Sequence, residues 1–437
     1  MTASDPTIDA GLVASLRGLD QDGRRLFALR TLRMFGYGAL AVVLVLYLAA
    51  AGLEPLAIGA VLTLTLLGDT LVSLWLTTNA DRLGRRRVLI ASSALVVVSG
   101  LVFAATDWLP LLVLAGIVGV ISPTGNEVGP FLAVEQAGLA QVVPARRRTA
   151  VFAWYHLAGL IATACGALLA GVIGQTLIGA GWSALEAHRA VVIGYALIGV
   201  LLGLIAWTLS PRVEAHPPNV DGAPAVRRRL GLGRSRGVVA RLSALFVLDS
   251  FAGGFIPQTL LAFWITVRFD VEPATLGAVF FAANLLAAVS SLLAARLAAR
   301  FGLINTMVFT HLPANVLLIL VPFMPTLATA VGVLLVRFFL SQMDVPARQS
   351  YVMAVVEPDE RAAAAGVTGI ARTVGAAVSP SIATVLMASA GSAAIPFVIA
   401  GGLKIVYDLL LYRDFRGHRP PEEVAPVRPP PVPPAAA

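Results

Sequence analysis

The chain has 437 residues, of which 58% are hydrophobic and only 13% are charged, and its mean hydropathy is +0.84. Soluble globular proteins are about 45–50% apolar and about a quarter charged. Because so few charges cannot cover a soluble surface of this size, the composition excludes a soluble enzyme or binding domain and predicts an integral membrane protein.

The formal net charge of +8 comes from arginine, because Lys404 is the only lysine. The arginines occupy short segments between apolar runs, which indicates membrane topology and not a nucleic-acid partner. The single cysteine, Cys165, excludes an intrachain disulfide, and neither it nor the five histidines has metal-ligand spacing. We therefore expect no metal and no cofactor.

Apolar runs of about 20 residues can cross the roughly 30 Å hydrocarbon core of a bilayer. The sequence predicts an all-α membrane protein with twelve such helices, at 27–51, 55–78, 88–107, 110–135, 150–174, 189–209, 241–266, 274–296, 303–323, 326–346, 362–388 and 394–412. The first 25 residues are polar to mixed and do not resemble a cleavable signal peptide, so we expect the first helix to be retained.

Loops that are rich in arginine alternate with loops that are poor in arginine along this series of helices. They precede the first helix and recur in every second loop, whereas the opposite side carries only Arg189 and Arg268. The positive-inside rule then places both termini in the cytoplasm of a cell that holds the protein in its inner or plasma membrane. The near absence of lysine beside abundant alanine and arginine favours a high-GC bacterial source.

One long polar stretch divides the twelve helices into two groups of six. We expect a cytoplasmic segment at 1–26, a first six-helix bundle at 27–210, a cytoplasmic linker at 211–238, a second bundle at 239–413 and a Pro/Ala-rich disordered tail at 414–437. An amide, an acid, a valine and a proline recur in order at Asn126–Pro130 and Gln342–Pro346. Weak internal similarity of this kind is typical of parallel transporter repeats.

The loop between the second and third helices reads TTNADRLGRRR over residues 77–87. Gly84 permits a tight turn between antiparallel helices. Asp81 places an anion where it can pair with arginines or meet the N-terminus of another helix. A degenerate copy follows the eighth helix, in which Arg300 and Gly302 are kept and Ala299 replaces the acid.

This loop resembles the G-x-x-x-D-R-x-G-R-R signature of the major facilitator superfamily and departs from it only at Thr77. The resemblance implies two pseudo-symmetric six-helix bundles that work by alternating access. It also implies a conformational-switch loop, whose members here are Asp81, Arg82, Gly84, Arg85 and Arg86. The expected branch is bacterial and drug-efflux-like, although the fifth helix lacks the Gly-Pro pair of many proton-coupled antiporters.

Ionisable groups inside a membrane are costly and usually face a cavity or a partner. Asp249, near the middle of the seventh helix and followed by Gln258, is the best candidate for a proton or cation site; the alternative is half of a buried ion pair. Asp69 in the second helix either binds a proton or supports the Asp81 loop.

Four further polar side chains are candidates for coupling or substrate binding. Glu127 and Asp344 either line the cavity or pair with Arg147, Arg348 or Arg361. Arg337 and Arg372 either bind an anionic substrate or neutralise Asp344, and neutralisation is slightly favoured. Arg30 and Arg33 are expected to be anchors that reach the membrane surface, and His311 a packing residue.

The predicted function is secondary active transport of small molecules across the bilayer, with proton-coupled efflux of apolar or amphiphilic compounds by a monomer as the leading expectation. Transport of an organic anion or metabolite, by symport or uniport, is the alternative, and a non-transporting membrane sensor is a remote one. No G-x-x-x-x-G-K-[ST] motif is present, so ATP is not expected to drive transport directly.

Overall fold

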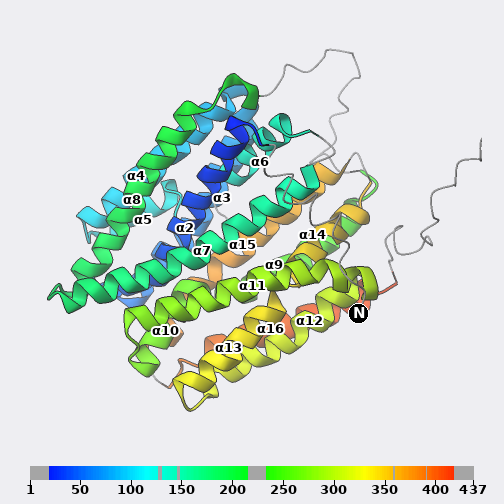
Figure 1. The fold of residues 1–437 in the computed structure, drawn as a ribbon. Coiled ribbons are helices and arrows are strands. Elements are labelled where there is room, and N and C mark those ends of the chain that lie inside the picture. Colours follow the sequence, from blue (N-terminus) through cyan, green and yellow to red (C-terminus); the bar gives the residue numbers. More distant parts are fainter. Residues whose placement is uncertain are drawn as a thin grey trace, which may run out of the picture.

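The computed structural model is helical throughout the residues that it describes, which are 19–125, 130–144, 148–214, 233–357, 360–389 and 391–417 (Figure 1). The first half comprises α2 (Gln21–Ala50), α3 (Pro55–Leu83), α4 (Arg85–Ala105), α5 (Leu109–Val118), α6 (Phe131–Val142), α7 (Arg148–Gly179) and α8 (Ala184–Thr208), followed by the short 3-10 helix η2 (Pro211–Val213).

The second half comprises α9 (Arg236–Gly254), α10 (Gln258–Phe269), α11 (Pro273–Phe301), α12 (Leu303–Leu320), the 3-10 helix η4 (Val321–Phe323), α13 (Leu327–Ser341), α14 (Asp344–Ala354), α15 (Arg361–Met387) and α16 (Ile395–Phe415). Eleven helical segments in the described part of the chain are long and apolar enough to cross a membrane. The interrupted pair α5 and α6 supplies the twelfth, in agreement with the predicted count.

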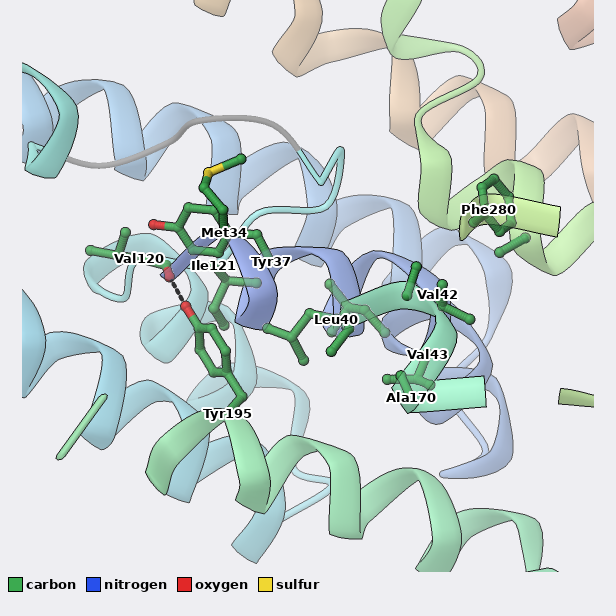
Figure 2. Packing of buried hydrophobic residues seen from close by; sticks show 14 of the residues in the cluster. Met34, Tyr37, Leu40, Val42, Val43, Val120, Ile121, Ala170, Tyr195 and Phe280 are labelled. Carbon is green, nitrogen blue, oxygen red and sulfur yellow. Dashed lines mark hydrogen bonds between the residues drawn. The ribbon is translucent and has the colours of Figure 1, made fainter. Parts of the chain in front are cut away.

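The fourth predicted helix, 110–135, is not continuous. The α5 helix ends at Val118, and α6 begins only at Phe131. The carbonyl of Val120 lies in this break, where it accepts a hydrogen bond from the hydroxyl of Tyr195 on α8 (Figure 2). A side chain from a neighbouring helix therefore satisfies a backbone group that an unbroken helix would have satisfied itself.

The seventh and tenth predicted helices are also divided. Residues 255–257 separate α9 from α10, and Pro257 cannot donate the backbone hydrogen bond that a continuous helix needs. A shorter break separates α13 from α14, which starts at Asp344 and carries Pro346 in its first turn. The second amide-acid-valine-proline segment, Gln342–Pro346, thus includes the break in the tenth helix. The first segment ends at Pro130, which precedes α6 directly, and its residues 126–129 lie outside the described part of the chain.

The most extensive contacts between the two halves are those of α7 with α11, α3 with α15, and α2 with α10. At Gly171 of α7 a Cβ would lie only 2.3 Å from the carbonyl oxygen of Pro273, so only glycine permits this approach. Thr63 of α3 and Ser381 of α15 are hydrogen-bonded at 2.8 Å. Phe280 of α11 belongs to the same buried cluster as residues of α2 and α7 (Figure 2).

All of these contacts lie away from the side of the bundle at which α2 begins and α16 ends, which we call the terminal side. Gly171 is near the far end of α7, and Thr63 is within the first turns of α3, which starts on that same far side. The halves are therefore joined on the far side, and the space between helices on the terminal side forms the cavity described next.

Candidate functional site

A cavity of about 1930 Å³ opens on the terminal side. Most of its wall comes from the second half, namely the end of α11, the start of α12, α14, the first turns of α15 and the end of α16. The first half contributes Leu132 and Gln136 of α6. Both halves thus line one space, as alternating access requires.

The lining of this cavity is strongly basic. Its arginines come from four elements of the second half and are Arg300, Arg348, Arg361, Arg372 and Arg416. No aspartate or glutamate occurs among the described residues that line it. Neutral hydrogen-bonding groups, including Gln349, Ser350 and Thr368, and the aromatic rings of Phe246 and Tyr412 complete the wall.

Arg348 on α14 connects the cavity to two buried carboxylates. Its Nη1 donates to Asp344 Oδ2 at 2.9 Å, one turn earlier on the same helix, and to Asp249 Oδ2 on α9 at 3.2 Å. Arg348 also lies over the ring of Phe246, 5.6 Å from the centroid. The partner of Asp344 is thus Arg348, and neither Arg337 nor Arg372 forms an ion pair with it in the described part of the chain.

Asp249 is the central carboxylate of a buried ion-pair cluster. In addition to Arg348, it binds the ammonium group of Lys404 on α16, with a Nζ–Oδ1 distance of 2.5 Å. Asp249 and Lys404 are only 5% and 7% exposed. Of the two interpretations open for Asp249, the geometry therefore matches the buried ion pair.

A second buried polar group lies beside this cluster. His311 Nδ1 of α12 is 2.9 Å from Asp408 Oδ1 of α16, and Asn315 Nδ2 donates to Asp408 Oδ2 at 2.8 Å. Asp408 is fully buried, and His311 is 4% exposed. His311 is buried, as a packing residue would be, and it also takes part in a polar network that the sequence did not predict.

The first half has its own buried ion pair. Arg33 Nη2 of α2 lies 2.6 Å from Glu135 Oε2 of α6, and both residues are almost completely buried. The hydroxyl of Tyr155 also donates to Glu135, and Arg30 stacks over the Tyr155 ring at 4.4 Å. The prediction that Arg30 and Arg33 reach the membrane surface is therefore wrong, because a carboxylate and aromatic rings inside the bundle accommodate both.

Three other candidates lie apart from the cavity lining. Asp69 of α3 is buried and accepts a hydrogen bond from Ser73 at 3.2 Å. Gln258, at the start of α10, faces Gly125 of the first half. Arg337 of α13 stacks on Phe338, and its Nε is buried without a hydrogen-bond partner among the residues that the structure describes. Glu127 lies outside the described residues.

The predicted switch loop forms the turn from α3 to α4. Asp81 and Arg82 are in the last turn of α3, and Gly84 takes a φ of +94°, which favours glycine. Arg85 donates from its guanidinium group to the carbonyls of Ala137 and Val213 at 3.3 and 3.2 Å. The loop is therefore attached to α6 and η2 of its own half.

Sequence reasoning did not single out Lys404, Asp408, Arg348 or Glu135 as site residues. Lys404 and Asp408 are four residues apart in the last predicted helix, so they share one face, and that signal was available. Arg348 lies just beyond the predicted end of the tenth helix, and Glu135 is the last residue predicted for the fourth. Neither residue was placed in the site because the ends of these two helices were predicted at the wrong positions.

Comparison with known proteins agrees with this architecture. The family model described as "Major Facilitator Superfamily" matches residues 26–378. An uncharacterized membrane protein of Saccharomyces cerevisiae is 31% identical over 424 residues, which cover 91% of this chain and 94% of that protein.

Two solved structures illustrate the shared fold. The nucleoside transporter NupG superposes with a TM-score of 0.69 at 15% identity, covering 91% of this chain and 100% of that chain. The human organic anion transporter MFSD10 superposes with a TM-score of 0.61 at 18% identity, covering 90% and 100%. Such low identities show the fold alone, and these two proteins are named for different cargoes. With the family model and the yeast relative, they show that the chain belongs to the major facilitator superfamily of membrane transporters.

Proposed function

We propose that this protein carries small organic anions across the membrane by alternating access. The observation that supports this cargo is the acid-free cavity wall with its five arginines. Guanidinium groups bind carboxylates and phosphates through paired, charge-assisted hydrogen bonds. Of the two cargo classes that the sequence leaves open, the cavity favours the organic anion.

Arg348 and Arg372 are the proposed anion ligands. Both guanidinium groups line the cavity, and within the part of the chain that the structure describes, Nε of Arg372 is buried without a hydrogen-bond partner. An anion bound to both would be attracted by two positive charges and would supply the missing acceptor. Phe246 and Tyr412 offer apolar surface for the rest of such a molecule.

An apolar cargo fits this wall poorly. Closing the cavity around it would remove water from five guanidinium groups and return no hydrogen bonds, which is unfavourable. The fold does not by itself indicate drug efflux, because proteins that share a fold can perform different functions. We therefore propose anion transport in place of drug efflux.

Coupling to protons follows from the position of Arg348. Asp249 and Asp344 compete with any anion in the cavity for its guanidinium group. A proton on Asp249 would leave Asp344 as the one charged carboxylate that holds Arg348 in the described part of the chain. The weaker competition would let proton and anion each favour binding of the other. The expected mode is therefore symport, and Asp69 remains the alternative coupling residue.

The proposed orientation places the terminal side in the cytoplasm of a plasma membrane. Single cysteines in a Cys165→Ala background test it by labelling with a reagent that cannot cross the membrane. Cysteines at Arg85 and Arg234 should react only from inside, and one at Ser392 only from outside. Labelling of Arg234 and Ser392 from the same side would contradict this arrangement.

Binding measurements on purified protein test the cargo class. Citrate, succinate, benzoate and glucose 6-phosphate should be compared with glucose and with the cation tetraphenylphosphonium, using thermal stabilisation as the readout. At least one anion should stabilise the protein, and Arg372→Gln should weaken its binding by about ten- to a hundredfold, the usual effect of losing a charged hydrogen bond.

The matched control is Arg268→Gln, which removes an exposed arginine from the last turn of α10. Its anion affinity should equal that of the wild type. Stabilisation by tetraphenylphosphonium and by no anion would refute the proposal and restore the apolar or cationic cargo.

A further inference from the structure

A second, smaller pocket of about 550 Å³ lies where the turn between α3 and α4 meets the end of α8 and η2. Its basic residues are Arg82, Arg86 and Arg87, and its apolar wall includes Ile90 and Trp207. None of these residues lines the large cavity. The pocket is therefore separate from the proposed transport site, and the inference below does not depend on the cargo.

Among the described residues that line this pocket, the one carboxylate is already engaged. Glu214 Oε2 accepts from the backbone N–H of Arg85 at 2.6 Å, and Oε1 accepts from that of Arg86 at 3.2 Å. Glu214 therefore caps the first turn of α4. Among the residues that the structure describes, the guanidinium groups of Arg82, Arg86 and Arg87 have no ion-pair partner. Three arginines thus face one carboxylate, which leaves an excess of positive charge.

The apolar part of the pocket faces outward from the bundle. Trp207, near the end of α8, is 65% exposed, and the guanidinium group of Arg86 lies over its ring, 5.6 Å from the centroid. Leu83 beside it is 40% exposed. Tryptophan is enriched where a transmembrane helix meets the headgroup layer, and this one ends a spanning helix. The pocket therefore presents charge and apolar surface together at the membrane boundary.

We propose that this pocket binds the phosphodiester headgroup of an anionic phospholipid. The phosphate is held by Arg86 and Arg87, with Arg82 at the rim, and the glycerol backbone and upper acyl chains lie along Trp207 and Ile90. A free phosphate compound would satisfy the arginines but not the apolar wall. Basic pockets at helix ends are suited to such headgroups.

Purified protein in detergent tests the proposal through lipid binding, a readout independent of transport. Short-chain dioctanoyl-phosphatidylglycerol, dioctanoyl-phosphatidylcholine and sn-glycerol 3-phosphate are titrated, and bound molecules are counted by native mass spectrometry. The wild type should retain one phosphatidylglycerol more tightly than phosphatidylcholine. The variant Arg86→Gln/Arg87→Gln should bind it about thirty-fold more weakly, as expected for two arginines near an anionic lipid.

Arg268→Gln again provides the control and should leave the number of bound lipid molecules unchanged. Arg268 is distant in sequence from the pocket residues, and its guanidinium group stacks on Phe269. Trp207→Leu is the second variant, in case the double variant does not fold, and it should also weaken binding. Equal retention of both lipids, or full retention by these variants, would overturn the proposal. If sn-glycerol 3-phosphate bound as tightly as phosphatidylglycerol, the ligand would be a free phosphate compound and not a lipid.

Discussion

The carboxylate of Asp249 on α9 is shared between two cations from different helices, the ammonium group of Lys404 on α16 and the guanidinium group of Arg348 on α14. All three side chains are almost completely buried. Because burial of a charge without a partner is costly, the three groups depend on one another. The two cations differ in how many carboxylates they contact. If Asp249 is lost, Arg348 still pairs with Asp344, whereas Lys404 has no second carboxylate in the described part of the chain.

This asymmetry predicts an order of stabilities. Asp249→Asn leaves Lys404 buried and unpaired, and it should lower the free energy of unfolding by about 3–5 kcal/mol. Lys404→Met should cost less, because Asp249 keeps Arg348. The double variant Asp249→Asn/Lys404→Met should recover most of the loss. Thermal unfolding in detergent measures all three.

Transport assays on the same variants separate stability from coupling. If Asp249 carries the coupled proton, Asp249→Asn should abolish the pH dependence of anion uptake while leaving downhill exchange. Normal stability together with unchanged, pH-dependent uphill transport would contradict both roles for Asp249 and make Asp69 the next candidate.

The number of helices could be predicted because its signals are local. Each spanning segment is a run of apolar residues, and arginines recur in every second loop. The break in the fourth helix was missed because a long hydropathy window averages over the short segment 119–125, although its Ser-Pro-Thr-Gly sequence is a local signal that a helix ends. Pro123 and the positive φ of Gly125 mark the break in the structure.

Ion-pair partners could not be predicted in the same way. The sequence identifies Asp249 as a costly charge in the membrane, but its partner Lys404 is 155 positions away. Only the packing of α9 against α16 brings them together. The same limit applies to Arg33 and Glu135, which are 102 positions apart. A sequence therefore shows that a buried charge needs a partner, and the fold decides which one.

The hydrogen bonds of the Glu360 carboxylate, at the terminal side, should make the stability of the protein depend on pH. Its carboxylate accepts backbone hydrogen bonds from Gly233, Arg234 and Ser235, at 2.7, 3.0 and 2.9 Å. The bond from Ser235 is the largest cause that holds the pKa of Glu360 below its ordinary value, against the opposing effect of burial. A depressed folded-state pKa stabilises the protein above the unfolded pKa, and the stabilisation is lost as the pH falls through the folded pKa.

The variant Glu360→Gln should therefore melt at a lower temperature than the wild type at pH 7, and the difference should shrink as the pH is lowered below 4.5, the ordinary pKa of the group. Glu357→Gln is the control, because Glu357 is exposed and its side chain has no hydrogen bond in the described part of the chain. A difference that grows on acidification would contradict this account.

A substitution in the turn between α3 and α4 should impair turnover without impairing substrate binding. Asp81 lies in the last turn of α3, a helix that contributes no described residue to the lining of the large cavity. If it stabilises one conformation of the transporter, Asp81→Asn should reduce the transport rate strongly and leave anion affinity near that of the wild type. Proteoliposome uptake and equilibrium binding measure the two quantities. Wild-type turnover in this variant would exclude a switching role.

Gly171 provides a direct test of how the far side closes. A Cβ at this position would meet the carbonyl oxygen of Pro273 at 2.3 Å and Cα of Gly277 at 2.9 Å, both in α11. These are backbone atoms, so they cannot move aside as the end of a flexible side chain can. Gly171→Ala should therefore destabilise the conformation that is closed on the far side by about 1–3 kcal/mol.

That penalty shifts the population towards the opposite conformation by roughly tenfold or more. The shift can be followed at Thr63, which is bonded to Ser381 in the closed contact between α3 and α15. In a Thr63→Cys/Cys165→Ala background, Gly171→Ala should speed thiol labelling. Gly194→Ala is the matched control, because a Cβ there meets nothing within 4 Å. Equal labelling rates in the two variants would mean that the α7–α11 contact does not control closure.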